Sequence, residues 1–254
     1  MSEHIARAAL GDRPDLDERP VYVARAGQER FIVGNLARAV PELISEYAPG
    51  DGKVLDVGCG RQPFRAALES RGLGYVGLDT QQNVDRSVDV VCPIDGPLPE
   101  DLAAKGPFSF VLCTEVLEHV ADWSAAFENI AVLLGPGGRA LITCPHVYPL
   151  HEEPYDFWRP TVYALRYFAA TNNLRVLHER RLGDGWDVLG TVLASGRPKP
   201  AAGAMNPVAY VVAGVAAALR AGMLSLAKRS VVRRLVPMSG KWYLSNVVVL
   251  EKPR

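Results

Sequence analysis

Short apolar runs alternate with amphipathic stretches over most of the chain. Seven runs are rich in β-branched and other apolar residues: 53–57, 74–78, 88–92, 108–113, 139–144, 174–182 and 242–251. Apolar strands that alternate with helices are typical of a parallel sheet that is covered on both faces. The pattern therefore predicts an α/β fold with a doubly wound, mostly parallel sheet.

The helices nearest the first strands carry boundary signals. Residues 28–47 place apolar side chains at helical spacing, and Pro41 is expected to kink this helix, break it or begin a second one. Pro63 suits the first turn of a helix that runs through Leu68. The sequence therefore predicts a helical N-terminal cover and a helix directly after the first strand.

Two further helices are predicted beside the fifth and sixth strands. Asp122 suits the N-cap of a helix with an apolar stripe from Trp123 to Leu134. The glycine-rich stretch 135–138 is expected to end that helix. Thr161 can cap the next one.

The alternation of strands and helices stops between residues 183 and 240. Stretches rich in Ala and Val at 208–218 and 223–232 predict helices, so we interpret 183–240 as an insertion in a single domain, 1–254. The apolar run 207–219 is shorter than the ~20 residues that span a bilayer, so no transmembrane segment is predicted. Basic residues around it allow a substrate lid or a homodimer face, which we favour, or peripheral membrane contact through 207–234.

Composition narrows the class of protein. The 28 Lys and Arg balance 28 Asp and Glu, which argues against a nucleic-acid partner. Residues 1–20 are polar and charged, so we expect a loose arm without a signal peptide, and a cytoplasmic protein with free thiols. The four cysteines form no CxxC pair, and no metal site is predicted. Each cysteine lies at or just beyond the carboxyl end of a predicted strand, either as a small apolar residue or as part of a thiol-sensitive site.

A glycine-rich turn follows the first predicted strand. In Val54–Gly60, the glycines Gly58 and Gly60 let the backbone approach a ligand at the carboxyl end of the sheet. A dinucleotide fingerprint needs a third glycine, but position 63 is proline, so a cofactor without a pyrophosphate fits better. Asp79 lies 21 positions after Gly58, where a carboxylate accepts hydrogen bonds from ribose hydroxyls.

Four motifs in this order resemble a known family. Val54–Gly60, Gly77–Asp79, Phe110–Val120 and Leu134–Gly138 are similar to the motifs of class I, Rossmann-like S-adenosylmethionine-dependent methyltransferases. The resemblance implies a seven-stranded sheet with an antiparallel last strand. It also implies S-adenosylmethionine as the cofactor and S-adenosylhomocysteine as its product. The acceptor stays open, because one fold hosts many functions.

The resemblance implies roles for single residues as well. Asp56, Gly58 and Gly60 would surround the methionine end of the cofactor, and Asp79 would hold its ribose. The other cofactor contacts that it implies are Cys59, Thr80, Ile94, Asp95, Cys113, Thr114 and Glu115. Structural alternatives stand beside these roles: the glycines could serve only a turn, Asp79 could cap a loop, and Glu118 could pair or cap near the cleft.

The segment 145–161 after the fifth strand is dense in histidine, acidic and aromatic residues. Loops at this end of a parallel sheet usually carry function. A hydroxyl acceptor needs a base, and histidine suits with its unperturbed pKa near ~6.5. The candidate bases are His151, His146 and His119, each of which could instead make a structural hydrogen bond. The candidate substrate contacts are Tyr148, Tyr155, Asp156, Trp158 and Arg159, although Asp156 and Arg159 could instead pair to brace the loop.

We therefore expect methyl transfer to a small-molecule acceptor. The segment 145–161 resembles one in methyltransferases that modify saccharides and natural products, so a hydroxyl of such a compound is the expected acceptor. Three alternatives stay open: a cofactor-binding scaffold without turnover, a protein or N-methyltransferase, and a nicotinamide-dependent oxidoreductase. Pro63 and the stretch 115–119 argue against the last of these.

Overall fold

The structure is a computed structural model that describes residues 27–202, 206–238 and 240–254. Seven strands form one sheet in the order β3-β2-β1-β4-β5-β7-β6. β7 pairs antiparallel with β5 and β6, and the other neighbouring strands are parallel. The predicted fold class is thus confirmed, including the antiparallel last strand. The expected loose arm, 1–20, lies outside the described residues.

The strand bounds agree closely with the apolar runs at five of the seven positions. The strands are β1 (Lys53–Val57), β2 (Gly74–Asp79), β3 (Val90–Val91), β4 (Phe108–Thr114), β5 (Leu134–Pro145), β6 (Arg175–Leu182) and β7 (Ser245–Glu251). β3 is shorter than predicted. β5 begins earlier than predicted, because 135–138 do not separate helix from strand. They bulge out of β5, whose pairing with β4 shifts register between Phe108 and Phe110.

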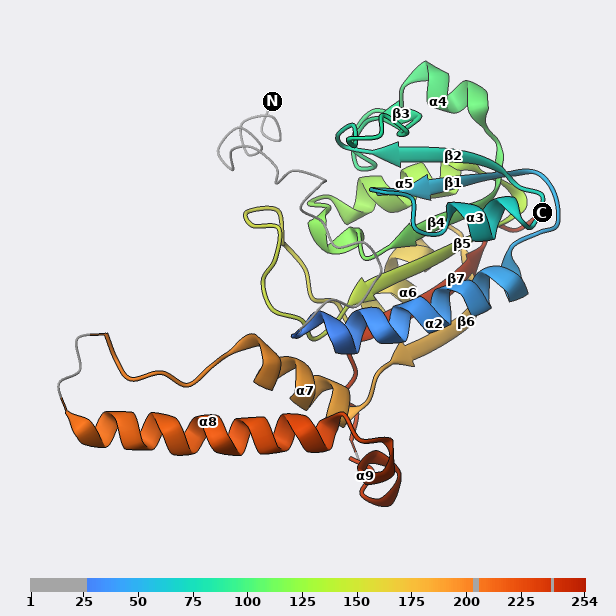
Figure 1. Ribbon diagram of the computed structural model, residues 1–254. Coiled ribbons are helices and arrows are strands. Elements are labelled where there is room, and N and C mark those ends of the chain that lie inside the picture. The colour runs from blue at the N-terminus through green and yellow to red at the C-terminus, as the bar shows by residue number, and fades with distance from the viewer. Residues whose placement is uncertain (1–26, 203–205, 239) are drawn as a thin grey trace.

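Helices cover both faces of the sheet. They are α2 (Glu29–Tyr47), α3 (Arg65–Glu69), α4 (Glu100–Lys105), α5 (Trp123–Leu133), α6 (Val162–Thr171), α7 (Gly185–Ser195), α8 (Pro207–Ala227) and α9 (Ser230–Leu235), with a 3-10 turn η2 (Leu117–His119). The apolar side chains of α5 and α6 share one core cluster with one face of the sheet. Those of α2 and Val188 of α7 share a second cluster with the other face, and Figure 1 shows the two layers.

The predicted helix boundaries meet three different outcomes. α2 is continuous through Pro41, so the helix is neither broken nor restarted there. Pro41 and Ala37, whose carbonyl loses its usual partner, are both exposed, so water can satisfy that carbonyl. Asp122 is the N-cap of α5, as predicted, and accepts from the Ala125 N–H at 3.0 Å. Thr161 occupies the N-cap position of α6, but its side chain makes no capping hydrogen bond.

The insertion before β7, residues 185–235, is here called the helical arm; its helix α7 packs against α2, and its helix α8 projects from the body of the molecule (Figure 1). α8 has 21 residues, longer than the predicted run because the helix continues past Arg220. That side chain donates to the Leu193 carbonyl of α7 at 2.5 Å. An 18-residue window of α8 has a mean hydropathy of 1.6, so by length and composition α8 could cross a membrane. This length corrects the prediction that no segment reaches the spanning limit.

Candidate active site

The glycine turn after β1 opens the sheet edge to a ligand. Gly58 has φ +67° and Gly60 has φ +48°, both in the left-handed region. A Cβ added at Gly58 would lie 2.3 Å from a methyl carbon of Val116, whereas one added at Gly60 would meet no atom within 4 Å. The N–H groups of Gly58 and Cys59 donate to the Leu78 carbonyl at 2.8 and 3.0 Å, which ties the turn to β2. Gly58 is thus required for packing, and Gly60 borders open space.

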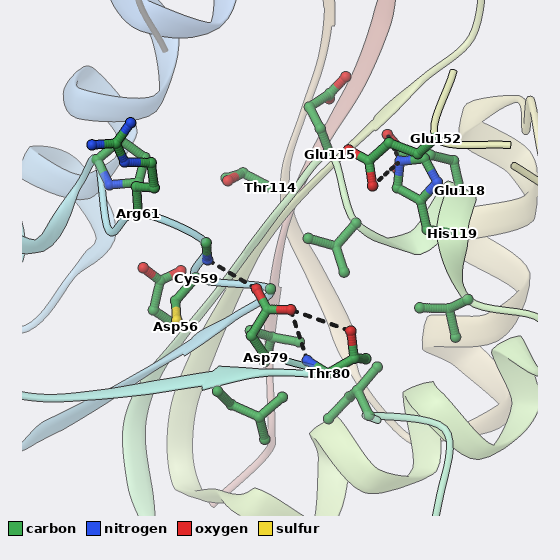
Figure 2. Close-up of a pocket in the computed structure, with 18 of the residues that line it drawn as sticks. Asp56, Cys59, Arg61, Asp79, Thr80, Thr114, Glu115, Glu118, His119 and Glu152 are labelled. Carbon is green, nitrogen blue, oxygen red and sulfur yellow. Dashed lines mark hydrogen bonds and ion pairs between the residues drawn. The ribbon is translucent and has the colours of Figure 1, made fainter. Parts of the chain in front are cut away.

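Asp79 connects the end of β2 to this turn. Its carboxylate accepts the Gly60 N–H at 2.9 Å and the Thr80 N–H at 2.7 Å, and Figure 2 shows both bonds. Each carboxylate oxygen can accept more than one hydrogen bond, so ribose hydroxyls can still bind there. The structure brings Asp79 and the glycine turn together as the sequence predicted.

Asp56 lies at the same edge, on β1. Its side chain is almost fully buried and accepts the Tyr75 hydroxyl at 2.6 Å. Burial raises the pKa of Asp56 to about 7, against the lowering effect of that hydrogen bond. Burial likewise raises the pKa of Glu115, after β4, to about 7. Both carboxyl groups would be stabilised as anions by a cationic ligand.

A single cavity unites these residues and extends to the acceptor side. Its lining includes six carboxylic acids and, of Lys and Arg, only Arg61 among the described residues. The acids are Asp56, Asp79, Asp95, Glu115, Glu118 and Glu152. Such a lining attracts a cation and repels a pyrophosphate. S-adenosylmethionine carries a sulfonium and an ammonium group, so the residues present suit it and do not suit a nicotinamide dinucleotide.

Ten of the eleven predicted cofactor contacts line this cavity. Cys113 is the one that does not, because its side chain is fully buried in the core cluster of α5 and α6. Cys59 and Cys92 do line the cavity. Burial raises the pKa of all four thiols, which keeps them protonated and favours the small apolar role over a thiol-sensitive site.

Two histidines meet at the acceptor end of the cavity. The rings of His119 and His151 lie edge to face with centroids 4.7 Å apart. Nδ1 of His119 lies 2.7 Å from the Tyr155 carbonyl, and Nδ1 of His151 lies 3.3 Å from Oδ2 of Asp156. Since a carbonyl only accepts, Nδ1 of His119 carries the proton and Nε2 holds the lone pair. Both Nε2 atoms lie within 4 Å of Oε1 of Glu118.

An ion pair in the loop holds His151 in place. Arg159 donates to both carboxylate oxygens of Asp156, at 2.6 and 2.7 Å. It also donates to the carbonyls of Tyr148 and Pro149. Of the predicted substrate contacts, only Tyr148 lines the cavity. Asp156 and Arg159 lie behind it and brace the loop, which was the structural alternative for this pair.

The other candidates point elsewhere. His146 stacks on Tyr243 with centroids 4.3 Å apart, its Nδ1 lies 2.9 Å from the Pro160 carbonyl, and it does not line the cavity. Tyr155 is buried, and Trp158 donates its ring N–H to the Val120 carbonyl at 2.9 Å. The structure thus places His119 and His151, but not His146, beside the cofactor residues.

Two of the six acidic residues of the cavity were not among the predicted site residues. Glu152, in the loop, has Oε2 3.9 Å from Nε2 of His119, and Figure 2 shows it beside His119 and Glu118. Glu118 was read as structural, yet it lies at the meeting point of both imidazoles. The only sequence signal for Glu152 was its place in the acidic and histidine-rich segment.

Fold and cavity together define a class I S-adenosylmethionine-dependent methyltransferase, with S-adenosylmethionine as its cofactor. The profile of the family described as "Methyltransferase domain" matches residues 27–182, which is more than half of the chain. The chain therefore belongs to this family. The match ends where β6 ends, so the helical arm lies outside it.

The chain is also similar to curated enzymes named "Ubiquinone biosynthesis O-methyltransferase". The one from Ralstonia nicotianae is 34% identical over 115 residues, covering 41% of this chain and 48% of the relative. The one from Xanthomonas campestris pv. campestris is 36% identical over 150 residues, covering 54% and 57%. The chain spans about half the length of the curated relatives it matches.

Solved structures share the fold at low identity. A SAM-dependent methyltransferase from Archaeoglobus fulgidus aligns with a TM-score of 0.52 and 15% identity, covering 90% of this chain and 96% of the other. A structure titled as the [4+2]-cyclase SpnF aligns with a TM-score of 0.53 and 16% identity, covering 93% and 85%. Because the second title names a different reaction, the fold alone does not decide the chemistry.

Proposed function

We propose that this protein transfers a methyl group from S-adenosylmethionine to a hydroxyl of a small acceptor, a sugar or another natural product. The observation that carries the proposal is the convergence of His119 and His151 at the end of the cavity that holds Asp56 and Asp79. The cofactor, when bound, supplies an electrophilic methyl group on a good leaving group. The names of the curated relatives support oxygen as the acceptor atom.

The chain's own contribution is to orient the acceptor and take its proton. Arg159 holds Asp156, whose Oδ2 lies 3.3 Å from Nδ1 of His151, and a proton on Nδ1 that is shared with Asp156 leaves the Nε2 lone pair for the acceptor. Burial, together with the neighbouring His119, lowers the pKa of His151, so its ring is neutral near pH 7 and can accept a proton. A hydroxyl that lies within hydrogen-bond reach of Nε2 loses its proton there as its oxygen becomes the nucleophile.

The test is product formation with a labelled methyl group. The protein is incubated with labelled S-adenosylmethionine and a panel of sugar and phenolic hydroxyl compounds, with amines for comparison, and mass spectrometry locates the label. We expect label on oxygen. His151→Ala should lower kcat/KM by about 10²–10⁴-fold, the usual contribution of a positioned acid or base.

His146→Ala is the matched control, because its ring stacks on Tyr243 outside the cavity. We expect it to keep kcat/KM within a few fold of the wild type. Label found only on amines would contradict the proposal, and so would equal losses in the two histidine variants.

We further propose that the helical arm rests on an anionic membrane surface. The large apolar side chains on the exposed side of α8 follow helical spacing in one stripe: Val208, Val211, Val212, Val215, Leu219, Met223 and Leu226. None of the most apolar window of α8 is buried against the protein. None of the residues that the structure describes between 183 and 240 lines the cavity, which favours an outward role over a lid.

Charge favours a membrane over a second protein copy. Residues 185–235 hold seven Lys and Arg and one Asp, whereas the rest of the chain holds 21 Lys and Arg against 27 Asp and Glu. A cationic apolar surface is attracted to anionic lipids, and identical cationic arms repel each other. The arm would thus hold the catalytic domain near acceptors that are embedded in or linked to lipid.

Vesicle sedimentation tests this placement. We expect binding to phosphatidylglycerol-containing vesicles, weaker binding at high salt, and little binding to pure phosphatidylcholine. Leu219→Glu, on the stripe, should abolish most binding, and Ala221→Glu, which adds the same charge on another exposed side of α8, should reduce it less. Equal losses would contradict the proposal. So would a dimer that dissociates in Leu219→Glu without vesicle binding in the wild type.

A further inference from the structure

Three potential ligand atoms converge at the acceptor end of the cavity. They belong to Glu118, His119 and His151, and all lie within 4.8 Å of one another. Oε1 of Glu118 is 3.8 Å from Nε2 of His119 and 3.9 Å from Nε2 of His151. These separations are too long for hydrogen bonds. Two ligands bonded to one ion at about 2.1 Å can be up to ~4.2 Å apart, so both distances leave room for an ion between them.

We propose that Glu118, His119 and His151 bind a divalent first-row transition-metal ion. Two imidazoles and carboxylate oxygens are ligands that Zn²⁺, Co²⁺ and Mn²⁺ accept. Oε2 of Glu152 lies 3.9 Å from Nε2 of His119 but is not one of the three clustered ligand atoms. The inference rests on the proposed function only for what the ion does during methyl transfer, not for its binding.

The state of Glu118 is the first independent support. Its side chain is fully buried, and Oε1 has no hydrogen-bond partner among the described residues. The other oxygen, Oε2, has only the Cys144 thiol at 3.8 Å. Glu115 adds a second buried carboxylate oxygen without a partner nearby. A buried carboxylate without a partner costs several kilocalories per mole unless a proton or a cation compensates it, and a metal ion would do so.

The orientation of the rings is the second support. Histidines that bind metals through one nitrogen usually donate the other N–H to a carbonyl or a carboxylate. Nδ1 of His119 faces the Tyr155 carbonyl at 2.7 Å, and Nδ1 of His151 faces Asp156 at 3.3 Å. With the proton on Nδ1 of each ring, both Nε2 lone pairs would be available to an ion beside Glu118. Arg159 in turn holds Asp156, so the support for His151 is itself fixed.

The ion would change how the acceptor loses its proton. A metal ion lowers the pKa of a hydroxyl that binds to it, so an ion held by these residues would help the acceptor lose its proton to water. In that case Nε2 of His151 would bind the ion and would not accept the proton of the acceptor hydroxyl. Methyl transfer to oxygen is the same in either case, and only the agent that ionises the hydroxyl differs.

The test is metal binding by the full chain without cofactor or acceptor. Protein treated with a chelator is titrated with Co²⁺, whose visible absorption reports nitrogen and oxygen ligation, and with Zn²⁺ by calorimetry. We expect one ion per chain. Glu118→Gln and His151→Gln should each weaken binding by at least about 100-fold, and Asp156→Asn, as a positioning variant, by about 10- to 100-fold. Circular dichroism confirms that each variant is folded.

His178→Gln is the control, because this histidine lies on β6 beside Tyr47, away from the cavity. It should bind Co²⁺ like the wild type. No Co²⁺ or Zn²⁺ binding, or equal binding by wild type and Glu118→Gln, would overturn the inference. If chelated protein still methylates hydroxyls at full rate, the inference fails and the proposed function stands. If the protein binds one ion but methylates no hydroxyl compound, the metal site stands and the proposed function is refuted.

Discussion

Substitution by alanine should have different effects at the two glycines of the glycine turn, Gly58 and Gly60. In Gly58→Ala, the new Cβ would meet Val116 at 2.3 Å and would adopt a positive φ. In Gly60→Ala, the φ is also positive, but the Cβ enters open space at the cavity wall. The first variant therefore tests packing, and the second tests occupancy of the cavity.

The magnitudes follow from three terms. A left-handed conformation costs alanine about 1–2 kcal/mol, and the smaller entropy of the unfolded chain returns about 0.4–1 kcal/mol. Gly60→Ala should thus lose at most about 1.5 kcal/mol of stability. Overpacking against Val116 adds about 1–3 kcal/mol at Gly58. At about 2–4 °C per kcal/mol for a chain of this size, Tm should fall by roughly 2–18 °C for Gly58→Ala and by at most about 6 °C for Gly60→Ala.

Cofactor affinity, unlike stability, should be reduced by the substitution at Gly60. The added methyl of Gly60→Ala occupies ligand space, so we expect S-adenosylhomocysteine to bind at least about tenfold more weakly, which is about 1.4 kcal/mol. Differential scanning fluorimetry measures the Tm values, and calorimetry measures the affinities on both folded variants. Wild-type affinity in Gly60→Ala, or a larger Tm loss there than in Gly58→Ala, would refute the reasoning.

Two further predictions concern charge. The folded pKa of Asp56, about 7, lies above its ordinary 3.8, so the folded state retains a proton that the unfolded chain releases, and stability from this group is lost as pH rises from about 4 to 7. Tm should fall less over this range in Asp56→Asn than in the wild type, and parallel curves in scanning fluorimetry would be the contrary result. Arg159→Lys keeps the charge but loses two-point binding to Asp156, so we expect a loss of roughly 1–3 kcal/mol in urea unfolding. Arg166→Lys, in the exposed pair with Glu179, should lose less than about 1 kcal/mol, and similar losses in both would argue against the bracing role.

The sheet and the cofactor turn were predictable because their signals are local. Apolar runs mark β1, β2 and β4. The glycine pair and Asp79, which mark the turn, all lie in one stretch of 26 residues that begins at Val54. Parallel strands place their carboxyl ends at one edge, so residues after those strands share one site. This rule requires no knowledge of long-range contacts.

The acceptor end was predictable only in part, because it depends on contacts between distant segments. His119 and His151 are far apart in sequence and meet because the loop folds back onto η2. There the Phe157 and Trp158 N–H groups donate to the Glu118 carbonyl at 2.8 and 3.3 Å. No periodicity encodes those bonds. For this reason His146, which has the same residue type and a neighbouring position, could not be separated from His151 by sequence.

The length of α8 was underestimated for a similar reason. Arg220 ends the apolar run in the sequence, yet it donates to the Leu193 carbonyl in the last turn of α7. A carbonyl there has no partner within its own helix, so the interaction satisfies both groups. The charge therefore lies inside the helix without ending it.

Calorimetric titration with S-adenosylmethionine and S-adenosylhomocysteine, on the wild type and on Asp79→Ala, tests the central claim most directly. The carboxylate of Asp79 joins β2 to the glycine turn at the wall of the acidic cavity. We predict micromolar binding of both ligands by the wild type and its loss in a folded Asp79→Ala variant. A folded wild type that binds neither ligand would contradict the assignment of this cavity as a methyltransferase cofactor site.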